Sequence, residues 1–205
     1  MYSWTETREP PEGRRRYCDN GGEVHLTEAA VMIAFAMHLI LVESFTEVDL
    51  HPDGEHAKRF DIRSALEHHG FELVEPVATN ACSGRYRCSD RSIRVAFTPG
   101  KGDVVARGPG GHVAAECKGG VINSNHPGQT SRLRRGLCEA VGLLMVRPAS
   151  AERQVAVVPA TQTTRRLAER MAPRAATAGI EVALVGAAGD VEFVRYSGDA
   201  GHVGP

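Results

Sequence analysis

Lysine is scarce in this 205-residue chain. Of its 24 basic side chains only three are lysines, namely Lys58, Lys101 and Lys118. A compact ammonium with a readily shifted pKa is not equivalent to a guanidinium, so Lys118, which stands among small and apolar residues, is a candidate for chemistry. Net charge is small as well: a formal value of −1 neither supports nor excludes a polyanionic partner. Such a partner would need a local basic surface.

The sequence also lacks signs of export, of a membrane span and of a zinc site. No secretory signal opens it, and its five cysteines are an odd number, so we expect reduced thiols in a cytoplasmic protein. Cys82 and Cys88 have no second close pair, which argues against zinc. The longest apolar run, from Ala29 to Val42, is too short for a bilayer and predicts a buried helix capped by Thr27. We therefore expect no membrane association.

The length suits a single α/β domain at residues 23–197, preceded by a flexible polar arm at 1–22 and followed by a loose glycine-rich tail at 198–205. The apolar patterning predicts a mixed sheet with helices on both faces. After the apolar helix we expect a helix ending near 69, strands at 71–74, 85–88, 92–97, 103–107 and 112–118, a helix at 129–145, a strand at 155–158, a helix at 163–178, and strands at 181–185 and 191–194.

Two apolar strands joined by a glycine turn, 108–111, carry the most informative side chains. Asp103 stands at the entrance to the first strand, and Glu116 and Lys118 stand near the exit of the second. Side chains two apart share a face, and a short turn makes the strands antiparallel neighbours, so the three should converge. Two carboxylates with a backbone carbonyl, here that of Cys117, suit Mg²⁺ or Mn²⁺, which would activate water for attack on a phosphodiester. Lys118 would orient that water or stabilise the developing charge.

The run Gly102-Asp103-Val104-Val105-Ala106, followed thirteen residues after the aspartate by Glu116-Cys117-Lys118, resembles the PD-(D/E)XK, or restriction-endonuclease-like, nuclease superfamily. The resemblance implies a core of helix, three strands, helix and strand, which the pattern of elements places at about residues 54–160. It also implies that Asp103 and Glu116 bind metal and that Lys118 assists catalysis. So short a motif does not identify a subfamily.

The chain departs from the family pattern at two places and leaves a third feature open. Gly102 stands where the motif has proline. Many members carry a further acidic residue on the helix before the sheet, and both Glu55 and Glu67 qualify. Some exonuclease-like members place Gln-x-x-x-Tyr on the helix after the third strand, whereas here Gln129 is followed by Leu133. Gln129 is thus either an accessory site residue or a residue making local hydrogen bonds at the helix start.

Arg132 and Arg135, on the same helix, are candidates for nucleic-acid contacts, with a solvated helix face as the alternative. We predict a metal-dependent nuclease that hydrolyses phosphodiester bonds, with DNA as the expected substrate and RNA as a second one, of restriction, defence or repair type. A homodimer or larger assembly is compatible with this. The alternative is a non-catalytic nucleic-acid-binding or interaction subunit that retains the nuclease fold. The glycine runs lack the spacing of phosphate loops and dinucleotide folds, which disfavours another α/β enzyme.

Overall fold

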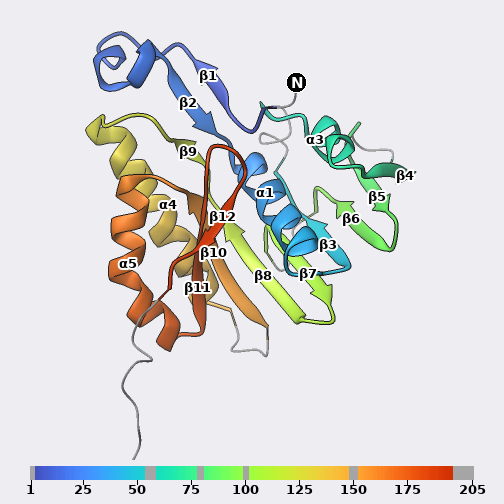
Figure 1. Cartoon of the computed structure of the whole chain (residues 1–205). Coiled ribbons are helices and arrows are strands. Elements are labelled where there is room, and N and C mark those ends of the chain that lie inside the picture. Colours follow the sequence, from blue (N-terminus) through green and yellow to red (C-terminus); the bar gives the residue numbers. More distant parts are fainter. Residues whose placement is uncertain (1–2, 54–58, 78–80, 99–101, 148–151, 196–205) are drawn as a thin grey trace, which may run out of the picture.

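The computed structural model describes residues 3–53, 59–77, 81–98, 102–147 and 152–195 (Figure 1). Its helices are α1 (Glu28–Leu41), α3 (Ile62–His68), α4 (Pro127–Met145) and α5 (Gln162–Thr177), with the short 3-10 helices η1 (Arg15–Tyr17) and η2 (Asp19–Gly21). Its strands are β1 (Glu6–Arg8), β2 (Glu23–Leu26), β3 (Glu47–Leu50), β4 (Glu72–Pro76), β5 (Gly84–Cys88), β6 (Arg91–Val95), β7 (Val104–Gly108), β8 (Gly111–Cys117), β9 (Gly120–Val121), β10 (Arg153–Pro159), β11 (Ile180–Val185) and β12 (Val191–Phe193). The expected mixed α/β architecture is confirmed.

One large mixed sheet, in the order β12-β11-β10-β8-β7-β3-β6-β5-β4, runs through the described part of the molecule. At its centre β7 is antiparallel to both β3 and β8, while β8 is parallel to β10. The end of β8, the end of β3 and the start of β7 therefore meet at one edge of the sheet. Because β7 runs antiparallel to β8, the predicted site residues at the start of β7 and at the end of β8 lie at the same end of the sheet.

Helices cover both faces of the sheet, with α1 on one and α4 and α5 on the other (Figure 1). The alternation along β10 shows the division: Val155 and Val157 pack in the cluster that contains α1, whereas Ala156 and Val158 pack in the cluster that contains α4 and α5. A strand buried on both faces reads as a continuous apolar run. The strand predicted at 155–158 is thus confirmed within β10.

The apolar run after Thr27 forms α1, as predicted. The Thr27 side chain accepts a hydrogen bond from the Ala30 backbone N–H at 3.2 Å, which satisfies one of the unpaired donors of the first turn. Most residues of α1 are buried, because the helix packs against the sheet and also contacts α3 and β12. Among the helices described, none has the length and apolar character needed to cross a membrane.

Residues 54–160 do not show the expected consecutive order of helix, three strands, helix and strand. The elements α1, β3, β7, β8, α4 and β10 follow one another in that order only when α3 to β6 and β9, which lie between them, are left out. Strand β3, of four residues, was not predicted from the sequence, and the helix ending near 69 was expected to be the first element of this core. That helix is described only as α3, after which Gly70 turns at φ +81°. Elements α3, β4, β5 and β6 instead form an insertion between β3 and β7 that extends the sheet.

The polar N-terminal segment was expected to be a flexible arm, and this expectation is wrong for the residues described. Strand β1 pairs with β2, and β2 pairs with β9, so a second sheet of three strands is formed. The Asn123 side chain joins the segments: it accepts from the Val24 N–H at 2.7 Å and donates to the Gly22 carbonyl at 2.8 Å. The expected loose tail, 198–205, lies outside the described residues.

Candidate active site

The predicted hairpin of β7 and β8 is confirmed, and it brings Asp103 beside the end of β8. The last ladder pair at this end is Val104 with Ala115, and the Asp103 N–H donates to the carbonyl of the same Ala115 at 3.0 Å. The Asp103 carboxylate accepts a hydrogen bond from the Cys117 N–H at 2.8 Å. Because the N–H and C=O of one strand residue face the same neighbour, the Cys117 carbonyl faces the side of Asp103. Its thiol is fully buried in the core with α1.

The Glu116 carboxylate is buried beside a like charge. Burial raises its pKa, and the nearby Asp103 raises it further, whereas the Arg147 guanidinium acts in the opposite direction. Arg147 forms an ion pair with Glu116, and both side chains are largely buried. The structure therefore neutralises one of the two predicted metal ligands with an arginine that the sequence analysis did not identify.

Arg147 also accounts for the glycine that stands in place of the motif proline. Gly102 has φ +156°, which the fixed φ of proline near −65° cannot reach. A Cβ at this position would lie 2.9 Å from the Ala115 carbonyl oxygen and 3.0 Å from Arg147 Nη2. Glycine at position 102 thus gives the arginine the space to reach Glu116.

Lys118 lies just past the end of β8, between α1 and α4. Its Nζ is 3.2 Å from Glu139 Oε1 and 3.7 Å from Glu28 Oε1. Burial favours the neutral amine, but Glu28 and Glu139 together outweigh it, so the pKa of Lys118 is raised and the ammonium stays charged. Asp103 acts on Lys118 in the same direction at longer range. The three motif residues thus gather at one sheet edge, with Lys118 held by two other acids.

Glu28, the first residue of α1, is a site residue that sequence reasoning missed. Burial raises its pKa to about 7, Lys118 opposes that rise, and Asp103 and Asp53 add to it. The available signal was an acidic residue directly after the helix cap Thr27 at the start of a buried helix. Of the acidic residues that the sequence analysis offered for this role, Glu67 makes an exposed ion pair with Arg63 on α3, and Glu55 lies outside the described residues.

A cleft of about 290 Å³ opens onto the two motif carboxylates. Besides Asp103 and Glu116 its lining comprises His51, Pro52, Asp53, Phe97, Thr98 and Gly102. His51 and Thr98 are tied together, because the His51 ring nitrogen Nδ1 lies 2.9 Å from the Thr98 carbonyl oxygen. The segments after β3 and after β6 thus form two walls of the opening, and Gly102 and Asp103, just before β7, form a third.

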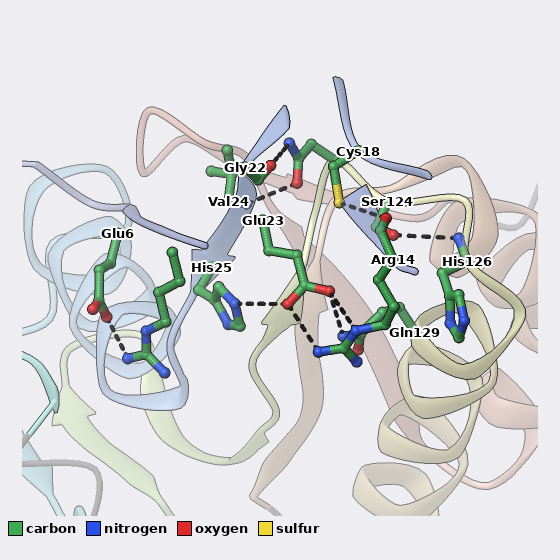
Figure 2. A network of polar contacts seen from close by, with 12 residues as sticks. Glu6, Arg14, Cys18, Gly22, Glu23, Val24, His25, Ser124, His126 and Gln129 are labelled. Atoms are coloured by element: carbon green, nitrogen blue, oxygen red, sulfur yellow. Dashed lines mark hydrogen bonds and ion pairs between the residues drawn. The ribbon is translucent and has the colours of Figure 1, made fainter. Parts of the chain in front are cut away.

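A second cavity, of about 380 Å³, lies on the Glu28 side of the cluster. We call it the arginine pocket, and its lining residues are Arg8, His25, Leu26, Thr27, Glu28, Arg59, Gly119, Gly120, Val121, Gln129, Arg132 and Leu133. Of the two arginines singled out from the sequence, Arg132 lines it and Arg135 does not. Gln129 also lines it, but its amide donates to the buried carboxylate of Glu23 at 3.1 Å rather than to the motif acids (Figure 2).

The donor set fits a Mg²⁺ or Mn²⁺ ion that is held by few protein ligands. In the described ranges no three His, Cys, Asp or Glu side chains converge as a ready metal-holding group. Mg²⁺, however, is commonly held by one or two carboxylates with waters and substrate phosphate oxygens, not by a closed protein cage. Asp103 and Glu116, which line one cleft and of which Asp103 raises the pKa of Glu116, are such a pair. Comparison with known proteins finds no matching family model, no matching curated protein and no matching solved structure.

Proposed function

We propose that this protein is a Mg²⁺- or Mn²⁺-dependent nuclease that hydrolyses phosphodiester bonds, with DNA as substrate, of restriction, defence or repair type. The observation that carries the proposal is the convergence of Asp103, Glu116 and Lys118 at one sheet edge. The order α1, β3, β7, β8, α4, β10, with the elements between them left out, supports it, because it is the order that the resemblance to PD-(D/E)XK nucleases implies. A cytoplasmic location belongs to the same proposal.

In this proposal Asp103 and Glu116 would hold the metal ion, and the Cys117 carbonyl, on the Asp103 side of the strand, would supply a third oxygen. The ion would polarise the scissile phosphate and lower the pKa of a bound water. Lys118, kept charged by Glu28 and Glu139, stabilises the negative charge that develops on the phosphate oxygens. Glu28, with a pKa of about 7, is suited to accept a proton from the attacking water near neutral pH.

A cleavage assay tests the proposal. Purified protein is incubated with linear, circular and single-stranded DNA, and with RNA, in Mg²⁺, in Mn²⁺ and in EDTA. We expect metal-dependent cleavage by the wild type, its loss in Lys118→Met and in Asp103→Asn, and unchanged cleavage in Glu72→Gln, which alters an exposed carboxylate on β4. A wild type that cuts none of the substrates and binds neither metal would overturn the proposal.

The Arg147–Glu116 ion pair favours one alternative, a non-catalytic nucleic-acid-binding or interaction subunit with the same fold. An arginine that permanently neutralises Glu116 would leave Asp103 as the remaining motif carboxylate. In that case nucleic acid binds equally well in EDTA and in Mg²⁺, and Lys118→Met changes neither binding nor cleavage. The same assay, read together with a binding measurement, separates the two functions.

A further inference from the structure

We infer that the arginine pocket is a phosphate-binding subsite that holds the sugar–phosphate backbone of a nucleic-acid strand beside the bond to be cut. The inference rests on the proposed function for the position of that bond. Independently of that function, we infer the class of ligand, the residues that hold it and the side of the catalytic cluster from which the nucleic-acid strand enters.

Positive charge is concentrated in this cavity although the chain as a whole carries a formal net charge of −1. Arg8 comes from β1, Arg59 precedes α3 and Arg132 lies on α4, so three separate parts of the chain each contribute a guanidinium. Among the described residues of the lining Glu28 is the single acidic one, and Arg8 already forms an ion pair with Glu6. Arginine presents several N–H donors in a planar fork that matches phosphate oxygens.

Two helices begin at the same cavity. Thr27 and Glu28 are the cap and first residue of α1, and Gln129 and Arg132 lie in the first two turns of α4. Backbone N–H groups at a helix start carry partial positive charge and favour anions. The first N–H groups of α4 already bond to His126, so the guanidinium groups remain the main source of attraction for phosphate.

The wall of the pocket is held in place by a buried carboxylate behind it. Glu23 is 3% exposed and is not part of the lining. Figure 2 shows His25, Arg14 and Gln129 pointing toward it; His25 Nε2 lies 3.4 Å from its carboxylate, Arg14 Nε 3.3 Å away, and Gln129 donates at 3.1 Å. These partners orient His25 and Gln129 before any ligand arrives, which lowers the entropic cost of binding.

The arginine pocket is linked to the proposed catalytic cluster through Glu28. Glu28 lines it and lies 3.7 Å from Lys118 Nζ. Gly119 and Gly120, which follow Lys118 in the chain, also line the pocket. A Cβ on Gly119 would lie 2.4 Å from the Glu28 backbone nitrogen. Glycine therefore allows the end of β8 to pass close against the start of α1. A nucleic-acid strand in the pocket would therefore lie beside the Glu28–Lys118 pair.

A second arginine-lined cavity, of about 350 Å³ between α4 and α5, provides the matched control. Arg134, Arg166 and Arg170 line it, and neither Glu28 nor any motif residue does. Arg59, Arg132, Arg166 and Arg170 are all exposed. The double variants Arg59→Gln/Arg132→Gln and Arg166→Gln/Arg170→Gln thus remove equal charge from the two cavities.

Fluorescence anisotropy with a labelled 20-nucleotide single-stranded DNA, in EDTA so that nothing is cut, measures the binding. We expect Arg59→Gln/Arg132→Gln to weaken affinity by about tenfold or more and to reduce the slope of log Kd against log salt concentration by about 0.7 for each lost phosphate contact. The control double variant should stay within about threefold of wild type. Oligonucleotides with and without a 5′-phosphate then distinguish a terminal phosphate, which would bind more tightly when present, from an internal phosphodiester, which would bind equally.

Equal losses in both double variants, or a larger loss in the control, would overturn the inference in favour of diffuse attraction or of the cavity between α4 and α5. Failure of the subsite and failure of the proposed function are distinguishable. If the wild type cuts DNA with Mg²⁺ but binding is unchanged in Arg59→Gln/Arg132→Gln, the subsite is wrong and the nuclease stands. If binding depends on the pocket but nothing is cut, the subsite stands without the nuclease.

Discussion

Replacing Arg147 with glutamine should increase the affinity of the protein for Mn²⁺. Arg147 forms an ion pair with Glu116 and lies against Gly102, next to Asp103. In the proposed site the same Glu116 carboxylate binds the metal, so the guanidinium and the metal compete for it. Glutamine removes the charge and keeps a polar side chain, although a shorter one than that of arginine.

The expected size of the effect follows from the burial of the pair. The side chains of Arg147 and Glu116 are 18% and 11% exposed, so solvent screens their interaction less than that of a surface pair. A hydrogen bond between charged groups in such a place contributes about 1.5–3 kcal/mol. Since about 1.4 kcal/mol corresponds to a factor of ten, loss of the competitor should tighten Mn²⁺ binding by about 10- to 100-fold.

Isothermal titration calorimetry with Mn²⁺ measures the affinity directly, and thermal unfolding gives a second readout. Without metal, Arg147→Gln should unfold at a lower temperature than wild type because Glu116 then faces Asp103 without its counter-ion. Added Mn²⁺ should raise that temperature more than it does for wild type. Arg165→Gln, which breaks an exposed ion pair with Glu192, is the control and should change neither. An unchanged or weaker Mn²⁺ affinity in Arg147→Gln would refute the competition.

Three further predictions concern Lys118, Glu28 and Glu23. Lys118→Met should lower the cleavage rate by about 10²- to 10⁴-fold with an unchanged circular dichroism spectrum, and a rate near wild type would remove Lys118 from the chemistry. The pKa of Glu28 is raised from 4.5 to about 7, so the folded protein holds a proton that the unfolded chain releases above pH ~4.5; the free energy of unfolding should fall as pH rises from ~5 to ~7. In Glu28→Gln this pH-dependent loss of the free energy of unfolding should be smaller by up to about 3 kcal/mol, as measured by thermal unfolding at pH 5 to 8 in EDTA. An equally steep fall in the variant would contradict the burial argument. Glu23→Ala, which leaves Arg14, His25 and Gln129 without their buried partner, should cost about 3 kcal/mol in urea denaturation, against less than about 0.5 kcal/mol for exposed Glu72→Ala.

Local patterning was sufficient to predict much of the fold. The apolar run of α1, the helical stripe of α4 and the continuous apolar strand in β10 each carry their signal within one stretch of sequence. The hairpin of β7 and β8 was equally accessible, because a glycine turn between two apolar strands fixes their pairing. That hairpin alone brings Asp103 close to Glu116 and Cys117.

The rest depended on contacts between distant segments. The four residues of β3 carry too little alternation to stand out, and their place at the centre of the sheet is set by β6 and β7. The polar strands β1 and β2 are stabilised by pairing with each other and with β9. Glu28 and Arg147 enter the site only because α1 and the end of α4 pack beside β8, which no local pattern records.

The meeting of the α1 start with the end of β8 has a consequence for how the protein becomes active during folding. Glu28 is contributed by the first long helix, and its partner Lys118 is contributed by a strand that follows the whole inserted segment of α3, β4, β5 and β6. Closing so long a stretch of chain is entropically costly and slow. A nascent chain that has formed only the β7–β8 hairpin therefore holds Asp103 and Glu116 together without the Glu28–Lys118 pair. The complete cluster exists only once the native packing is finished.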